Sequence, residues 1–138
     1  MSSSPISLRI DERGRARLAA YAELRRESQH TLALRLLEEG LRMLDHPGIV
    51  FRDGPTGRRA SLIAGPDVWE VIGGVRGASG DAELDEAAED LGLARAQVDV
   101  AVRYYGEFGA EIDDRIQRNS EDADRRRALF QEGANALA

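Results

Sequence analysis

Polar and apolar side chains alternate near the start of the chain, where residues 5–11 read "PISLRID". A period of two is typical of a β-strand that buries one face and exposes the other. Ser7 and Arg9 then share the exposed face. A guanidinium group can donate two hydrogen bonds to O6 and N7 of guanine, and a serine hydroxyl can bond several bases. The spacing predicts a strand whose exposed face either contacts base edges or simply meets water.

Two helices are expected after this strand. Asp11 is a good helix N-cap and predicts a helix to about residue 26, and Ser28 predicts a second helix over about residues 29–44. No second strand is expected before residue 49, so the first strand has no pairing partner nearby in the sequence. A lone strand leaves its backbone N–H and C=O groups unsatisfied.

Leucines at helical spacing give the second helix an apolar stripe. One strand and two helices form too small a unit to bury a core of their own. We therefore expect a second copy to pair with the first, so that two strands form an antiparallel ribbon across a two-fold axis above four helices. The residues expected at this dimer interface are Leu8, Ile10, Leu34, Leu37 and Leu41.

Residues 5–44 resemble the ribbon-helix-helix DNA-binding proteins of the Arc, MetJ and CopG kind. The resemblance rests on the alternating strand, the helix lengths and the Ser-Gln-His-Thr start of the second helix. It implies that the outward strand residues enter the major groove and that the second helix holds a phosphate at its N-terminus. The DNA-binding residues that it implies are Pro5, Ser7, Arg9, Ser28 and Thr31. Where the family often has glycine, two residues before the serine, this chain has Arg26.

Residues 46–116 resemble the small DUF433-type domain, which begins with His-Pro-Gly-Ile as this segment does. The resemblance implies a winged-helix-like antitoxin domain that is encoded beside nucleases of the PIN kind. The residues themselves predict strands at 49–52 and 59–63 and helices at 67–75, 82–91 and 95–108.

The last two of these helices, joined at Gly92, form a predicted helix-turn-helix. Arg95, Gln97 and Asp99 give the second helix a mixed start, and the helix before it is acidic. We therefore expect this domain to bind protein or to dimerise rather than to read DNA. The residues expected in its core are Leu84, Ala87, Ala88, Leu91, Val98, Ala101, Val102 and Tyr105.

The net charge of −6 is unevenly distributed. Residues 1–45 hold eight arginines against seven acidic residues, residues 46–80 hold four against three, and residues 81–138 hold seven against fifteen. The acidity thus belongs to the C-terminal part and does not exclude DNA binding by the first part. With no cysteine, no signal peptide and no membrane-length apolar run, the sequence predicts a cytoplasmic protein with no membrane association.

No set of residues predicts an enzyme, a metal site or a cofactor. The acidic residues between 81 and 90 lack ligand-spaced His or Cys and are better explained as a solvated helix face. His30 and His46 have no nucleophile beside them, and Trp69 is expected in the core. The glycine-rich stretch from residue 73 to 80 lacks the Gly-Lys-Ser/Thr ending of a phosphate-binding loop.

The tail over residues 111–138 is charged and poor in large apolar residues, so it is expected to be partly helical, near 112–118 and 125–130, or disordered. Arg125, Arg126 and Arg127 form its one basic run. We hypothesise that this run, with Leu129 and Phe130 as anchors, binds the acidic metal-holding site of a toxin. A solvated helix face, or a helix packed on the second domain, is the alternative.

The sequence therefore predicts a mainly α protein. A dimeric ribbon-helix-helix domain over residues 1–45 precedes a winged-helix-like α+β domain with a β-hairpin over residues 46–110, and the tail covers residues 111–138. The resemblances imply an antitoxin that represses its own promoter and neutralises a PIN-like ribonuclease. A stand-alone transcriptional regulator and a protein-interaction adaptor that binds no DNA are the alternatives.

Overall fold

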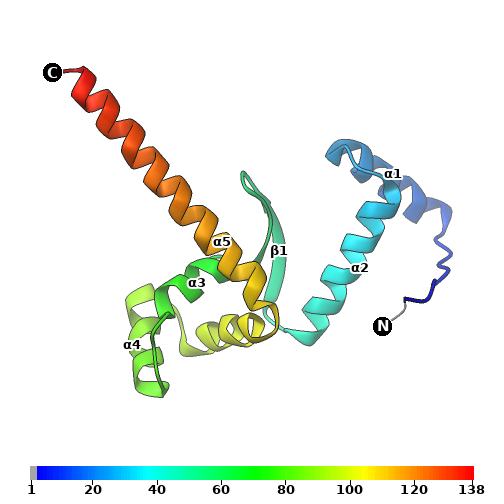
Figure 1. Cartoon of the computed structure of the whole chain (residues 1–138). Helices are drawn as coiled ribbons and strands as arrows, with labels where there is room; N and C mark the ends of the chain where they lie inside the picture. The colour runs from blue at the N-terminus through cyan, green and yellow to red at the C-terminus, as the bar shows by residue number, and fades with distance from the viewer. Residues whose placement is uncertain (1–2) are drawn as a thin grey trace. The chain divides into compact units, whose positions relative to one another are not determined.

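The computed structural model describes residues 3–138, and these form two compact units. The first unit ends at Leu41, and the second unit begins at Arg42. Helices dominate, and a two-stranded antiparallel sheet is the one sheet of the described part (Figure 1). The mainly α character expected from the sequence is confirmed.

Two helices make up most of the first unit. Helix α1 covers Glu12–Arg25, and the Asp11 carboxylate caps it by accepting a hydrogen bond of 2.8 Å from the backbone N–H of Gly14. Helix α2 covers Gln29–Asp45, so its last residues belong to the second unit. The hydroxyl of Ser28 accepts a 3.0 Å hydrogen bond from the backbone N–H of Thr31. Both predicted caps are therefore confirmed.

The turn between these helices contains a left-handed residue that is not glycine. Arg26 has φ 54° and ψ 44°, and its N–H closes the end of α1 on the carbonyls of Ala22 and Glu23. Side chains with a Cβ are disfavoured in this conformation, which is why glycine commonly occupies such a position. Arg26, the residue at which the sequence departs from the ribbon-helix-helix pattern, thus adopts the backbone conformation that glycine favours.

The second unit is built on a hairpin and three helices. Strand β1, Ile49–Gly54, pairs antiparallel with β2, Gly57–Leu62, and Phe51 lies opposite Ala60. Helices α3, Val68–Val75, and α4, Asp81–Leu91, follow, and α5 runs from Arg95 to Ala136. Gly92 ends α4 in the left-handed conformation expected of it, with φ 69°.

A continuous apolar core joins the hairpin to all three helices of this unit. Its buried members are Ile49, Ala60, Leu62, Val68, Val71, Ile72, Val75, Ala88, Val98, Ala101, Tyr104 and Ile112. Asp67 ties β2 to the start of α3, because its carboxylate accepts hydrogen bonds from the Ser61 hydroxyl at 2.6 Å and from the Trp69 indole at 3.2 Å and also pairs with Arg59. The indole is half-buried and packs against this core, as expected.

Of the core residues predicted from α4 and α5, Ala88, Val98 and Ala101 are buried, and Leu84, Ala87, Val102 and Tyr105 are partly buried against the same core. Tyr104 is fully buried, whereas Tyr105 is half-buried and its hydroxyl donates to Asp113. Leu91 is exposed rather than buried, because it lies at the end of α4 against Gly74 of α3. Both differences come from where the neighbouring helices lie, which helical periodicity alone does not specify.

The tail is more regular than the sequence predicts. Helix α5 bends at Phe108, which has the non-helical angles φ −115° and ψ 32°, and then continues through the tail to Ala136 (Figure 1). The sequence predicted two short, fraying helices or disorder in the tail, whereas the structure has one continuous helix there. Side chains three and four residues apart stabilise it, as in the Asp114–Arg118 and Asp124–Arg127 pairs. Arg115 also fixes the hairpin turn by donating to Thr56.

Tyr104 lies in a polar network beside the bend. Its hydroxyl donates to Glu111 at 2.8 Å and accepts from Arg42, which also bonds Glu111 at 2.9 Å. The Arg42 guanidinium lies 3.8 Å from the centre of the Phe108 ring. His46 packs its ring against Tyr104 and Phe108 and lies 2.6 Å from Glu107. This network joins the last turns of α2 to α5 on both sides of the bend.

Replacement of Arg26 by glycine should stabilise the protein. Relief of the left-handed strain is expected to raise the free energy of unfolding by about 0.5–1 kcal/mol, part of which the greater freedom of glycine in the unfolded chain offsets. Urea denaturation followed by circular dichroism measures the change. Gly92→Ala is the matched control and should destabilise by about 1 kcal/mol, because it introduces the same strain. A loss of stability in Arg26→Gly would show that the arginine side chain contributes more than its backbone strain costs.

Alkaline pH should destabilise the protein through Tyr104. Burial raises the pKa of its phenol well above the usual range, the hydrogen bond to Glu111 raises it further, and Arg42 opposes the shift. Above a pH of about 10 the unfolded chain releases this proton while the folded chain keeps it, so the free energy of unfolding falls as pH rises. Denaturation in urea between about pH 9 and pH 11 should therefore show a steeper decline for the parent protein than for Tyr104→Phe. Equal slopes would contradict the expectation.

Candidate nucleic-acid interface

The N-terminal arm, residues 3–10, exposes its apolar side chains. Ile6 is 78% exposed and Leu8 is 72% exposed. The arm has no regular secondary structure and no strand partner among the described residues. The strand predicted over residues 5–11 is therefore not formed in the described chain, which gives these residues no pairing edge.

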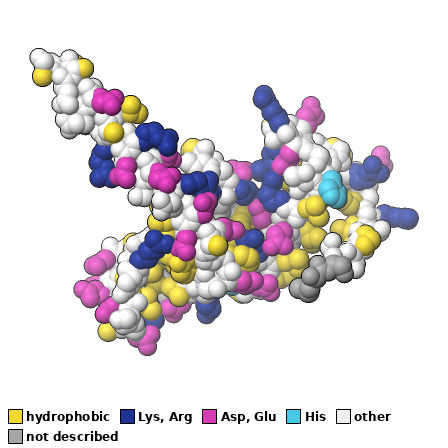
Figure 2. Space-filling view, viewed as in Figure 1, with side chains coloured by type: hydrophobic (Ala, Val, Ile, Leu, Met, Phe, Trp, Pro, Cys, Tyr) yellow, Lys and Arg dark blue, Asp and Glu magenta, His cyan; other side chains and the backbone are white. Residues whose placement is uncertain are grey.

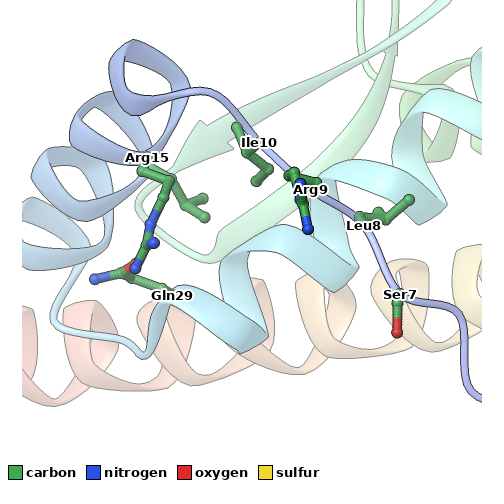
Figure 3. A pocket seen from close by; sticks show the side chains of 7 residues that line it. Ser7, Leu8, Arg9, Ile10, Arg15 and Gln29 are labelled. Carbon is green, nitrogen blue, oxygen red and sulfur yellow. The ribbon is translucent and has the colours of Figure 1, made fainter.

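Ile10 is where the arm meets α1. A Cβ at Gly14 would overlap the Cγ2 atom of Ile10, so the glycine lets the arm lie close to the first turn of the helix. In Figure 3 the side chains of Ser7 and Arg9 point in the same direction from the arm, whereas Leu8 points another way. Ser7 and Arg9 are both exposed. The two predicted base-reading side chains are thus close together and accessible.

An open hollow of about 610 Å³ lies beside these residues. The residues that line it are Ser7, Leu8, Arg9, Ile10, Arg15, Leu18 and Gln29. Arg15 from α1 and Gln29 from the start of α2 therefore join the arm at one surface (Figure 3). Neither Arg15 nor Gln29 was predicted as a site residue from the sequence. The spacing could have indicated Arg15, because it lies four residues after the Asp11 cap and so on the side of the helix that faces the arm.

The start of α2 is already hydrogen-bonded within the chain. The Ser28 hydroxyl accepts from the N–H of Thr31 and donates to the Thr31 hydroxyl at 2.8 Å. Ser28 thus serves as a helix cap, and the exposed Thr31 hydroxyl is the better placed of the two to meet a phosphate. Next to it, Glu27 and Arg35 form a two-hydrogen-bond ion pair that closes the turn.

Little of the apolar surface of the first unit is covered. Among its described residues, Ala22 and Leu32 are the buried apolar ones. The predicted interface leucines Leu34, Leu37 and Leu41 are each about half exposed, with 54%, 46% and 50% of their surface accessible. A second hollow of about 450 Å³ has a mostly apolar lining that includes Leu8, Ile10, Leu18, Tyr21, Leu32 and Leu36. Hydrophobic side chains are visible on the surface accordingly (Figure 2).

The predicted helix-turn-helix of the second unit has no comparable free cation at its reading position. Arg95, the first residue of α5, donates to Asp81, Asp85 and Asp99 over 2.7–2.9 Å. These three hydrogen bonds, that to Asp81 first, raise the pKa of its guanidinium. A cation held by three carboxylates cannot also pair with a phosphate without breaking them. The geometry therefore favours the first unit over the second as the nucleic-acid surface.

The predicted partner-binding residues lie on the last part of α5. Leu129 is 60% exposed and Phe130 is 76% exposed. Arg125 and Arg127 of the basic run are exposed and pair with acidic residues one turn earlier on the same helix, at 3.4 Å from Asp122 and 2.7 Å from Asp124. This segment presents its apolar and basic side chains to solvent.

Within residues 3–138, no three side chains of metal-binding type are grouped, and none of the helices combines the length and apolar composition needed to cross a membrane. Comparison with protein-family models, curated proteins and solved structures found no match. The interpretation of the surface therefore rests on its own geometry.

Proposed function

We propose that the protein is a homodimeric ribbon-helix-helix DNA-binding antitoxin. The observation that carries this proposal is the N-terminal arm, whose alternating sequence suits a strand although no other segment within residues 3–138 pairs with it. The exposed leucines of α2 accompany it. A second copy would supply both a strand partner and an apolar cover, because the two arms would pair with each other and the two leucine stripes would pack together.

The proposed dimer places the DNA contacts on its surface. In an antiparallel ribbon, Leu8 and Ile10 turn toward the helices while Ser7 and Arg9 of both copies face outward. A two-stranded ribbon fits the major groove, where Arg9 can donate two hydrogen bonds to guanine. Thr31 and the helix N-terminus can bind a phosphate on either side, and Arg15 adds positive charge beside the ribbon. Pro5 would lie at the outer end of the ribbon.

The second unit and its tail are proposed to bind the toxin. Three acidic partners neutralise the one arginine at the start of α5, which supports contact with protein rather than DNA. The resemblance of residues 46–116 to the winged-helix-like antitoxin domain suggests a PIN-like ribonuclease as the partner. Arg125, Arg126 and Arg127 would pair with the carboxylates of its active site, with Leu129 and Phe130 as anchors.

Dimerisation is tested by Leu37→Asp. The variant would bury two carboxylates at the proposed interface, and we expect it to lose both the dimer and much of the helicity of the first unit. Analytical ultracentrifugation and circular dichroism measure these two properties. Leu24→Asp is the control, because Leu24 is an exposed α1 leucine outside the proposed interface. A Leu37→Asp protein that is monomeric yet as helical as the parent would show that the first unit folds without a partner and would rule out the ribbon.

Sequence-specific DNA binding is tested by Arg9→Ala. Each lost bidentate contact to a base costs about 1–3 kcal/mol, and the dimer loses two, so we expect specific promoter binding to disappear while the dimer persists. Thr31→Ala should weaken binding to all sequences evenly, as loss of a phosphate contact does. Mobility-shift assays over a salt series measure both. Arg13→Ala, an exposed α1 arginine outside the hollow, controls for charge alone. If Arg9→Ala binds the promoter as tightly as the parent protein, Arg9 does not contact the bases and another surface does.

Toxin binding is tested by a chain truncated after Asn119. Co-expressed with a nuclease from the neighbouring reading frame, it should fail to silence that nuclease, whereas the full chain should succeed. Pull-down and RNase assays measure binding and inhibition. If the truncated chain still inhibits, the acidic helix α4 becomes the next candidate surface. If no neighbouring protein binds the full chain but promoter binding persists, the stand-alone regulator replaces the antitoxin.

A further inference from the structure

The core-facing stripe of α5 continues beyond the core. Ile112 is buried and Ile116 packs against the core, and one face of the helix then carries Ala123, Phe130 and Leu137. Residues 116, 123, 130 and 137 are seven apart, and this spacing returns to nearly the same side of a helix every two turns. Phe130 and Leu137 are 76% and 89% exposed. The protruding part of α5 thus has an uncovered apolar stripe.

Charge changes sign in the middle of this stripe. Glu121, Asp122 and Asp124 come immediately before Arg125, Arg126 and Arg127. All six lie on the exposed part of the helix, and the salt bridges Asp122–Arg125 and Asp124–Arg127 bridge the boundary within one chain. The acidic and basic side chains of this region are visible along the helix in Figure 2.

The centre of the apolar stripe and the charge boundary lie within two residues of each other. Ala123 lies midway between Ile116 and Phe130, and the sign of the charge changes between residues 124 and 125. A second copy of the helix, turned antiparallel about a two-fold axis near residues 123–124, would place Phe130 against Ile116 of the other copy. It would also place Ala123 against Ala123 and bring Asp122 near Arg126 of the other copy. An arbitrary partner has no reason to match both patterns, whereas a second copy matches both by symmetry.

We propose that the last part of α5 pairs antiparallel with the same helix of a second copy. Antiparallel pairing is preferred to parallel, because a parallel pair in register would set acidic residues against acidic residues and basic against basic. The segment past the core, residues 117–136, is about 30 Å long, which is enough for several layers of contacts but gives a small interface. The arm-mediated dimer of the proposed function would therefore strengthen the pairing by raising the local concentration of the second tail.

The pairing uses Arg126 and Phe130, which the proposed function assigns to the toxin contact. Insofar as that function holds, a second copy and the toxin compete for the tail. The pairing itself does not depend on the toxin or on DNA. Its test therefore uses the full chain alone, so that failure of the pairing and failure of the proposed function are distinguishable.

The chain has no cysteine, so a single introduced thiol reports the geometry. Ala123→Cys places two thiols across the proposed axis, and the full-length variant should form a covalent dimer under mild oxidation or with a short bis-maleimide. Ala134→Cys is the matched control, because Ala134 lies on the same side of the helix but far from the axis. This variant should stay largely uncross-linked. Cross-linking at both positions would indicate a parallel pair or random collision, and cross-linking at neither position or at Ala134→Cys alone would exclude the axis. Each of these results overturns the proposal.

Charge exchange tests the ionic part in the Ala123→Cys background. Asp122→Arg and Arg126→Asp should each slow cross-linking several-fold, because each sets like charges together across the axis. The double exchange should restore the rate, because it recreates opposite charges between copies. Circular dichroism checks that all three variants are equally helical, since residues 122 and 126 are also neighbours within the helix. If the double exchange cross-links no faster than the single variants at equal helicity, the proposed register is wrong.

Discussion

The apolar surface that the described residues of the first unit leave uncovered is the constraint on which the proposed assembly depends. Two helices and an arm bury two apolar side chains among the described residues of the first unit, while the arm and the α2 leucines stay largely exposed. Burying such side chains contributes about 1.5–3 kcal/mol each, which a unit of this size needs for its stability. In the proposed dimer, a second copy would cover these side chains and also give the arm a strand partner, so one association would satisfy both the side chains and the backbone.

The second unit has the opposite character. Its hairpin and helices close around a continuous core, and its cations are largely held inside the unit by carboxylates or backbone carbonyls. Arg59 pairs with Asp67, Arg95 with three aspartates, and Arg42 with Glu111. A cation whose hydrogen-bond donors are already paired in this way binds a phosphate only if it breaks those bonds. The distribution of unsatisfied groups, rather than net charge, therefore separates the proposed DNA-binding unit from the proposed protein-binding unit.

The first part of helix α5 packs in the core of the second unit, and its last part is exposed. Up to Ile116 its apolar stripe packs into the core, and beyond that point the same helical face continues without cover. The bend at Phe108 lies between Gly106 and Gly109 and is held by the network of Tyr104, Arg42 and His46. Glycine on both sides weakens the helix there, and the polar and aromatic contacts fix the bent form. The direction of the exposed segment is thus set inside the core of its own unit.

The sequence by itself determined the helices, their caps and the hairpin, because hydrophobic period, N-cap residues and turn residues act over a few neighbours. Asp11, Ser28, Asp67 and Gly92 all begin or end helices where expected. Tertiary structure alone decided that Tyr104 rather than Tyr105 is buried, that Arg15 and Gln29 join Arg9 at one hollow, and that the tail forms one helix with α5. These outcomes depend on which elements pack against which, and local periodicity contains no information about a neighbour distant in sequence. The strand predicted for the arm is not formed in the described chain, and the proposed dimer would supply the edge that such a strand needs.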